Sequence, residues 1–251
     1  MTTQPDFFST LSYEQLRIML NAGAEVRECH RVLSKAGLNP VGEILRGQGK
    51  FYQYNHYPKG DIYDRETHAQ YYYHAHRGIE GENGHFHTFL RPGGIPKALR
   101  PVERITPDRV TTRPVQANDE PAHLIAVSMD RYGWPIGLFT TNRWVTNQTW
   151  YTAEDTIELL DRFCIDHAYP SWPVNRWITA LFQLFRPQMI TLLHQRDQTV
   201  RDWVIRYPER DVFADRELEV TSSMRIDTEH QITELQAVSA QDSPPRLTIA
   251  Q

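Results

Sequence analysis

The order in which hydrophobic patterns follow one another along the 251 residues constrains the fold more than any other feature. Residues 10–46 carry apolar residues at helical spacing, and helical spacing returns over residues 152–208. Between them, residues 50–150 consist of short β-branched or aromatic segments separated by Gly, Pro, Asn and Asp. Residues 216–240 fit a strand or a helix, and residues 241–251 fit a flexible tail. This order predicts a single α+β domain, in which an N-terminal helix and C-terminal helices flank an antiparallel sheet.

The expected strands are short and lie between turn-forming residues. They cover residues 50–56, 70–77, 84–91, 122–129 and 136–146. The long connection over residues 92–121 is rich in proline and is expected to hold one edge strand near residues 109–115. A connection of this length in a compact domain is often functional.

Four histidines stand at alternate positions of two neighbouring expected strands. His74 and His76 share one face of the first strand, and His85 and His87 share one face of the second. Opposed side chains on paired strands start about 4.5–5.5 Å apart at Cβ, so four imidazoles on one face would converge on a single ion. The sequence therefore predicts a metal site on a β-hairpin.

The loop between the two strands decides whether the four histidines share a face. A tight turn at Asn83-Gly84, or a loop over residues 80–83, contains an even number of residues and places them together. An odd-numbered loop or a bulge would split them between the two faces. With an even loop, Glu80 and Glu82 join the histidine face, and together with Arg77 they are candidate catalytic residues.

Neutral imidazole suits a transition metal, and the expected cofactor is one ion of Fe, Cu or Zn. Three protein ligands with an open position would make a catalytic site, whereas four ligands would make a closed, structural one. Two other interpretations stay open, a metal-free acid–base or anion site and a structural polar network.

The spacing His-x-His-x-x-x-Glu at His74, His76 and Glu80 resembles the first metal motif of the cupin superfamily. The resemblance covers about seven residues. It implies that this spacing serves a metal on a β-scaffold, so a barrel-like or cupin-like sheet is one expected form. The glycine that cupins place before the histidines is replaced by a Tyr-rich strand, and no second cupin motif is found. No cupin activity is carried over.

Other polar residues are candidates for recognition of a substrate. Asn142, Arg143 and Trp144 lie in an unusually polar segment that is expected to be a strand, and Tyr72 is expected to help wall a pocket. His123 would be a further ligand if its strand neighboured the hairpin.

Asp197 interrupts the apolar stripe of its helix. A salt bridge between helices is the favoured interpretation for this carboxylate, and a role near the metal is the alternative.

Composition excludes several classes of function. The net charge of −4 offers no general attraction for nucleic acid, and no apolar run approaches the roughly 20 residues that span a membrane. The N-terminus has no secretory signal, and two cysteines make no disulfide framework, so the cytoplasm is the expected compartment.

These features favour a metal-dependent enzyme that acts on a small polar molecule. A redox metal, Fe or Cu, is preferred because several imidazoles and no thiolate are offered. The alternatives are a zinc-dependent hydrolase or lyase and a non-enzymatic sensor or carrier of a metal or small ligand.

Overall fold

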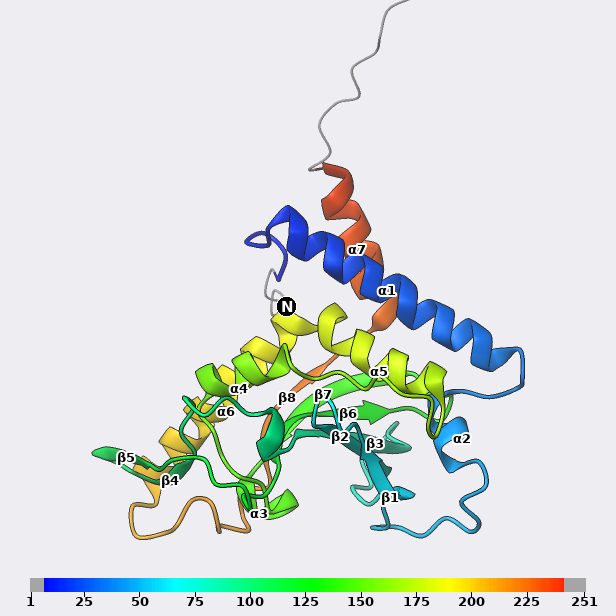
Figure 1. Ribbon diagram of the computed structural model, residues 1–251. Helices are drawn as coiled ribbons and strands as arrows, with labels where there is room; N and C mark the ends of the chain where they lie inside the picture. Colours follow the sequence, from blue (N-terminus) through cyan, green and yellow to red (C-terminus); the bar gives the residue numbers. More distant parts are fainter. Residues whose placement is uncertain (1–6, 242–251) are drawn as a thin grey trace, which may run out of the picture.

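A computed structural model describes residues 7–241, which adopt the α+β fold that the sequence predicts (Figure 1). The helices are α1 (Tyr13–Ser34), α2 (Pro40–Leu45), α3 (Arg143–Thr146), α4 (Ala153–Leu160), α5 (Trp172–Leu184), α6 (Arg186–Arg206) and α7 (Thr228–Gln241), with a 3-10 turn at Pro92–Gly94. The strands are β1 (Tyr57–Tyr63), β2 (Ala69–His74), β3 (Gly84–Leu90), β4 (Val102–Thr106), β5 (Arg109–Thr112), β6 (Ala122–Met129), β7 (Pro135–Thr141) and β8 (Val220–Arg225).

The main sheet is open and antiparallel. Its strands follow the order β1-β2-β3-β6-β7-β8, and β4 pairs with β5 in a separate hairpin. Within residues 7–241, β1 and β8 are the two edges and do not pair with each other, so the expectation of a barrel-like or cupin-like sheet is wrong. The sixth strand, β8, lies within residues 216–240, which the sequence assigns to a strand or a helix, and it extends the sheet at the edge next to β7.

Side-chain oxygens cap the starts of several helices, among them α1, α2 and α4. Ser12 and Gln15 form a capping box at α1, and the side chains of Asn39 and Thr152 accept hydrogen bonds at the starts of α2 and α4. Each cap satisfies backbone N–H groups that the first helical turn leaves without a partner.

Helices cover one face of the sheet, where α5 lies beneath α1 and α7 packs on α1 (Figure 1). Tyr71 and Phe86 point from β2 and β3 toward α5, where the Tyr71 hydroxyl donates to Asn175 Oδ1 at 2.6 Å. The ring centroids of Phe86 and Trp177 lie 5.5 Å apart. Because strand side chains alternate, the neighbours of Tyr71 and Phe86 along each strand point to the opposite face.

Several predicted boundaries are corrected. Residues 50–56 precede the first strand, because β1 begins at Tyr57. The strand predicted over 136–146 ends at Thr141, where Asn142 starts the short helix α3 by accepting a hydrogen bond from the Arg143 N–H. The tail predicted over 241–251 lies outside the described residues, apart from residue 241 at the end of α7.

In the part of the chain that the structure describes, no helix is both long and apolar enough to cross a membrane.

Candidate metal centre

Three buried histidines converge on the face of the sheet that points away from α5. Each of His74, His85 and His87 offers one ring nitrogen, and these nitrogens all lie within 4.8 Å of one another. The ring centroid of His74 lies 4.5 Å from that of His85 and 5.0 Å from that of His87. This spacing is close enough for one ion to bridge the rings after small side-chain rotations, since metal–nitrogen bonds are about 2.0–2.1 Å long.

The register of β2 and β3 brings these residues together. His74 pairs with His85, and Tyr72 pairs with His87, so all four side chains share one face. Both predicted loops are too short, because the last paired residues of the two strands are His74 and His85 and the connection runs over residues 75–84. It nevertheless holds an even number of residues, which is why the predicted sharing of one face is confirmed for these three histidines.

The histidine nitrogens are desolvated and poorly satisfied. Both ring nitrogens of His74 and the Nε2 of His85 are buried without a hydrogen-bond partner. Burial lowers the pKa of His74 to about 2, with smaller contributions from the other histidines, and burial also lowers the pKa values of His85 and His87. The rings are therefore neutral at pH 7, which is the form that binds a metal. Buried polar atoms without partners are rare, and a bound ion would satisfy these.

Glu82 holds the ring of His85 in place. Its Oε1 lies 2.7 Å from His85 Nδ1, and its Oε2 accepts from Arg77 at 3.3 Å. Burial raises the pKa of Glu82, but hydrogen bonds from His85 and Ser128 outweigh burial and the net shift is downward, so the carboxylate is ionised at pH 7. This contact directs the Nε2 of His85 toward the other histidines, as carboxylates commonly do for metal-binding histidines.

Arg77 and Glu80 have different surroundings. The guanidinium of Arg77 lies 3.9 Å from the ring centroid of Phe139, on the same side of the sheet as His85. Glu80 is exposed in the turn of the hairpin and has no hydrogen bond or ion pair within the described residues. Of the two predicted glutamates, Glu82 alone touches a histidine of the cluster.

A β-bulge brings His123 to the cluster. His87 pairs with Ala126, but Phe89 pairs with His123, so β6 has one extra residue over this interval. Without that residue, Leu124 would face Phe89 and His123 would point toward the helices. With the extra residue present, His123 points to the histidine face, where its Nε2 lies 2.9 Å from His87 Nδ1 and burial lowers its pKa to about 3. His123 therefore orients His87 as Glu82 orients His85.

His76 lies at the rim of the cluster. It follows the end of β2, is half-buried, and its ring centroid is 4.7 Å from that of His74 and 5.1 Å from that of His85. Its other face stacks on Tyr54 at 5.1 Å between centroids. It is not among the three histidines whose nitrogens converge, although it was predicted as a ligand on equal terms.

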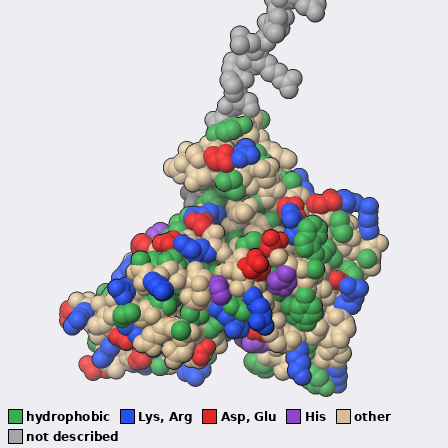
Figure 2. Space-filling model, viewed as in Figure 1, with side chains coloured by type: hydrophobic (Ala, Val, Ile, Leu, Met, Phe, Trp, Pro, Cys, Tyr) green, Lys and Arg blue, Asp and Glu red, His purple; other side chains and the backbone are tan. Residues whose placement is uncertain are grey.

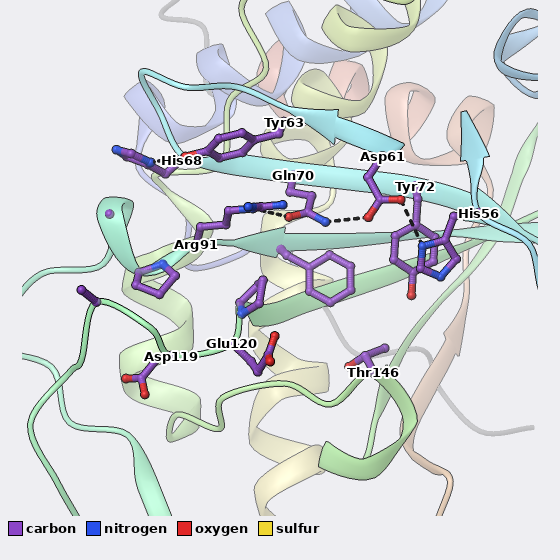
Figure 3. Close-up of a pocket in the computed structure, with 15 residues that line it drawn as sticks. His56, Asp61, Tyr63, His68, Gln70, Tyr72, Arg91, Asp119, Glu120 and Thr146 are labelled. Carbon is purple, nitrogen blue, oxygen red and sulfur yellow. Dashed lines mark hydrogen bonds and ion pairs between the residues drawn. The ribbon is translucent and has the colours of Figure 1, made fainter. Parts of the chain in front are cut away.

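A cavity of about 510 Å³ adjoins the cluster (Figure 3). Tyr72 separates the two, because its ring lines the cavity and lies 5.2–5.3 Å from His74 and His87 between centroids. His56 stacks on Tyr72 at 3.5 Å between centroids and lines the same cavity. The sequence does not single out His56, because it is the last residue of the strand predicted over 50–56 and has no second histidine at alternate spacing. Figure 2 shows a few separate histidine side chains on this face of the molecule, whereas His74, His85 and His87 are buried.

The predicted recognition segment has a structural role. Asn142 is fully buried, and its Nδ2 donates to the carbonyl oxygen of Val212 at 2.7 Å. Trp144 Nε1 donates to the carbonyl oxygen of Leu218 at 3.0 Å. Arg143 lies against Phe213 and lines a different, shallow cavity. Tyr72 is the one predicted substrate-binding residue that lines the cavity beside the histidines.

Asp197 joins two helices. Its Oδ2 accepts from the Ala153 N–H at the start of α4 at 2.7 Å, and its Oδ1 pairs with the buried Arg196 at 2.8 Å. The salt bridge therefore lies within α6, and the favoured interpretation of a salt bridge between helices is wrong: the contact of Asp197 that joins α6 to α4 is the hydrogen bond from the Ala153 N–H.

Comparison with known proteins places the chain in one family. No curated protein and no solved structure matches the sequence. One family model, described as a domain of unknown function (DUF6969), matches residues 20–226. The match includes the whole histidine cluster and the cavity beside it. Because it spans most of the chain, the protein belongs to the DUF6969 family.

Proposed function

We propose that this protein is a metal-dependent enzyme in which His74, His85 and His87 hold one iron or copper ion. The observation that carries the proposal is the set of three buried, neutral imidazoles whose ring nitrogens converge, with unpartnered nitrogens on His74 and His85. When bound, such an ion supplies one-electron or oxygen chemistry, and three protein ligands leave coordination positions open for it.

The surroundings of the cluster favour a redox metal over zinc. Zinc hydrolases pair a metal-activated water with a free base, commonly a glutamate. Glu82 is already hydrogen-bonded to His85 and Arg77, and Glu80 is exposed in the turn, so neither is placed to act as that base. The ligand set of three neutral nitrogens and no thiolate suits Fe, Cu and Zn alike, so the preference for a redox metal rests on the placement of the two glutamates.

The residues around the cluster would position the reaction and keep bulk water away from it. Glu82 and His123 hold two of the three rings through hydrogen bonds to their Nδ1 atoms. Phe139 packs against His85 and His87 with ring centroids 5.3 and 5.9 Å apart. The adjoining cavity has the size of a site for a small molecule.

The proposal is tested by elemental analysis of protein purified without a polyhistidine tag or nickel column. We expect about one equivalent of Fe or Cu in the wild type and a large loss in His87→Ala. His194→Ala is the matched control, because His194 is exposed on α6 and should leave the metal content unchanged. Absence of metal in the wild type, even after incubation with Fe, Cu and Zn salts, would exclude the proposal; one equivalent of zinc alone would replace the redox chemistry with hydrolysis.

A second candidate function is a metal sensor or carrier with a closed site. It is favoured by His76, which lies close enough to His74 and His85 to become a fourth ligand. His76→Ala separates the two functions. The enzyme proposal expects the metal to be retained with an unchanged X-ray absorption spectrum, whereas a closed site would lose one nitrogen ligand.

A further inference from the structure

The cavity beside the histidine cluster has walls of two different kinds. One wall is the outer face of β1, β2 and β3, which supplies aromatic rings from Tyr63, Tyr72 and Phe89. The facing wall is the segment 117–121 that leads into β6, together with Thr146 at the end of α3 (Figure 3). The rings of Tyr72 and Phe89 are roughly parallel, with centroids 5.6 Å apart, and form an aromatic floor.

Two hydroxyl groups at this cavity lack partners. Tyr72 is 5% exposed and lines the cavity, and its hydroxyl makes no hydrogen bond to any residue between 7 and 241. Figure 3 shows this hydroxyl pointing away from the strand and into the cavity. Thr146 Oγ1 is also buried without a partner. A polar ligand would satisfy both groups, and leaving the buried Thr146 Oγ1 without one is unfavourable.

Two charged side chains at this cavity have no ion-pair partner within the described residues. Arg91 donates from Nε to Gln70 at 2.6 Å, and its guanidinium lies 4.3 Å from the ring centroid of Tyr63, but no carboxylate neutralises it. Glu120 stands on the facing segment with neither an ion pair nor a hydrogen bond (Figure 3). Its neighbour Asp119 differs, because it is paired with Arg113 at 2.6 Å.

We infer that this cavity binds a small zwitterion, an amino acid with an aromatic or apolar side chain. Its carboxylate would pair with Arg91 and its ammonium group with Glu120, while its side chain would lie on the floor formed by Tyr72 and Phe89. The Tyr72 hydroxyl would form a further hydrogen bond with whichever of these two charged groups lies nearer the histidines. The role of this amino acid as substrate rests on the proposed function, whereas its binding does not.

Isothermal titration calorimetry on the full-length, metal-free protein tests the inference with three matched probes. L-Phenylalanine carries both charges, 3-phenylpropionate carries only the carboxylate, and 2-phenylethylamine carries only the ammonium group. We expect L-phenylalanine to bind at least tenfold more tightly than either of the others. Equal affinity for all three, or no binding of any, would overturn the inference.

Variants assign the two charges. Arg91→Gln should weaken L-phenylalanine about tenfold while leaving 2-phenylethylamine unchanged, and Glu120→Gln should weaken it while leaving 3-phenylpropionate unchanged. Arg131→Gln and Glu209→Gln, at exposed positions away from the cavity, are the matched controls. Variants that bind like their controls would refute the assignment.

Tyr72→Phe keeps the ring and its stacking on His56, so it tests the hydroxyl without removing the floor. It should bind L-phenylalanine several-fold more weakly at an unchanged melting temperature, and unchanged affinity would contradict the role given to this hydroxyl. Metal content, measured separately, distinguishes failure of this inference from failure of the metal proposal. Binding of L-phenylalanine by a protein that takes up no metal would leave the cavity assigned and the enzyme proposal refuted.

Discussion

Replacing Glu82 with glutamine should weaken metal binding without unfolding the protein. The Glu82 carboxylate contacts His85 Nδ1 at 2.7 Å and Arg77 at 3.3 Å, and its side chain is 4% exposed. The Glu82→Gln variant keeps the shape of the side chain and an oxygen that can accept from His85. It removes the negative charge that polarises the imidazole and balances Arg77.

The expected size of the effect follows from the role of the contact. Loss of a partner that orients a metal-binding histidine commonly lowers metal affinity about 10–100-fold, which corresponds to roughly 1.4–2.7 kcal/mol. Because Glu82 is ionised at pH 7 and shielded from water, its charge is poorly screened, and the upper half of this range is expected.

A chelator competition assay measures the change in affinity, and thermal unfolding of the metal-free protein checks the fold. Glu80→Gln is the matched control, because it removes the same charge from the same loop at an exposed position that touches none of the histidines. The reasoning would be refuted by equal metal affinities in the two variants. It would also be refuted if Glu80→Gln weakened binding and Glu82→Gln did not.

Three further predictions concern stability. The metal-free protein should be fully stable above about pH 6.5 and lose stability below it, because the pKa values of His74 and His123 are about 2 and about 3 in the fold and return toward 6.5 on unfolding. Each histidine then lowers the free energy of unfolding by about 1.4 kcal/mol per pH unit. Urea unfolding at pH 7, 6 and 5 measures this loss, and an unfolding free energy that does not change with pH would disprove it. Gly84→Ala should lower the free energy of unfolding by about 1–3 kcal/mol and lower metal content, because a Cβ there would overlap the Tyr73 hydroxyl and lie 2.7 Å from the backbone oxygen of His74. An unchanged melting temperature would contradict this. Asp197→Ala should cost roughly 3 kcal/mol by unpairing a buried arginine, yet metal content per folded molecule should stay at the wild-type level.

The features that the sequence predicts correctly are those that depend on local periodicity. Helical spacing before and after a β-rich middle is enough for the α+β class. Alternation along a strand is enough to place His85 and His87 on one face. The even-numbered connection from His74 is longer than expected, but its parity alone decides which side the histidines share.

What the sequence does not predict depends on contacts between distant segments. His123 reaches the cluster only because β6 carries an extra residue beside Phe89, and no turn or spacing signal in the sequence announces that bulge. His56 approaches it by stacking on Tyr72 from a segment outside regular structure. Asn142 looks like a recognition residue in a polar strand, but its side chain begins a helix and bonds Val212, which lies 70 residues away.

The position of the three convergent histidines on neighbouring strands also bears on the order of folding. His74, His85 and His87 belong to one hairpin, so closing the loop between them costs little chain entropy compared with joining β7 to β8 across the intervening helices. β-Hairpins form in microseconds, well before most domains complete their tertiary packing. The ligand set is therefore assembled by the part of the chain with the shortest-range contacts, and an ion captured there would hold β2 and β3 in register while β6 and the helices dock onto them.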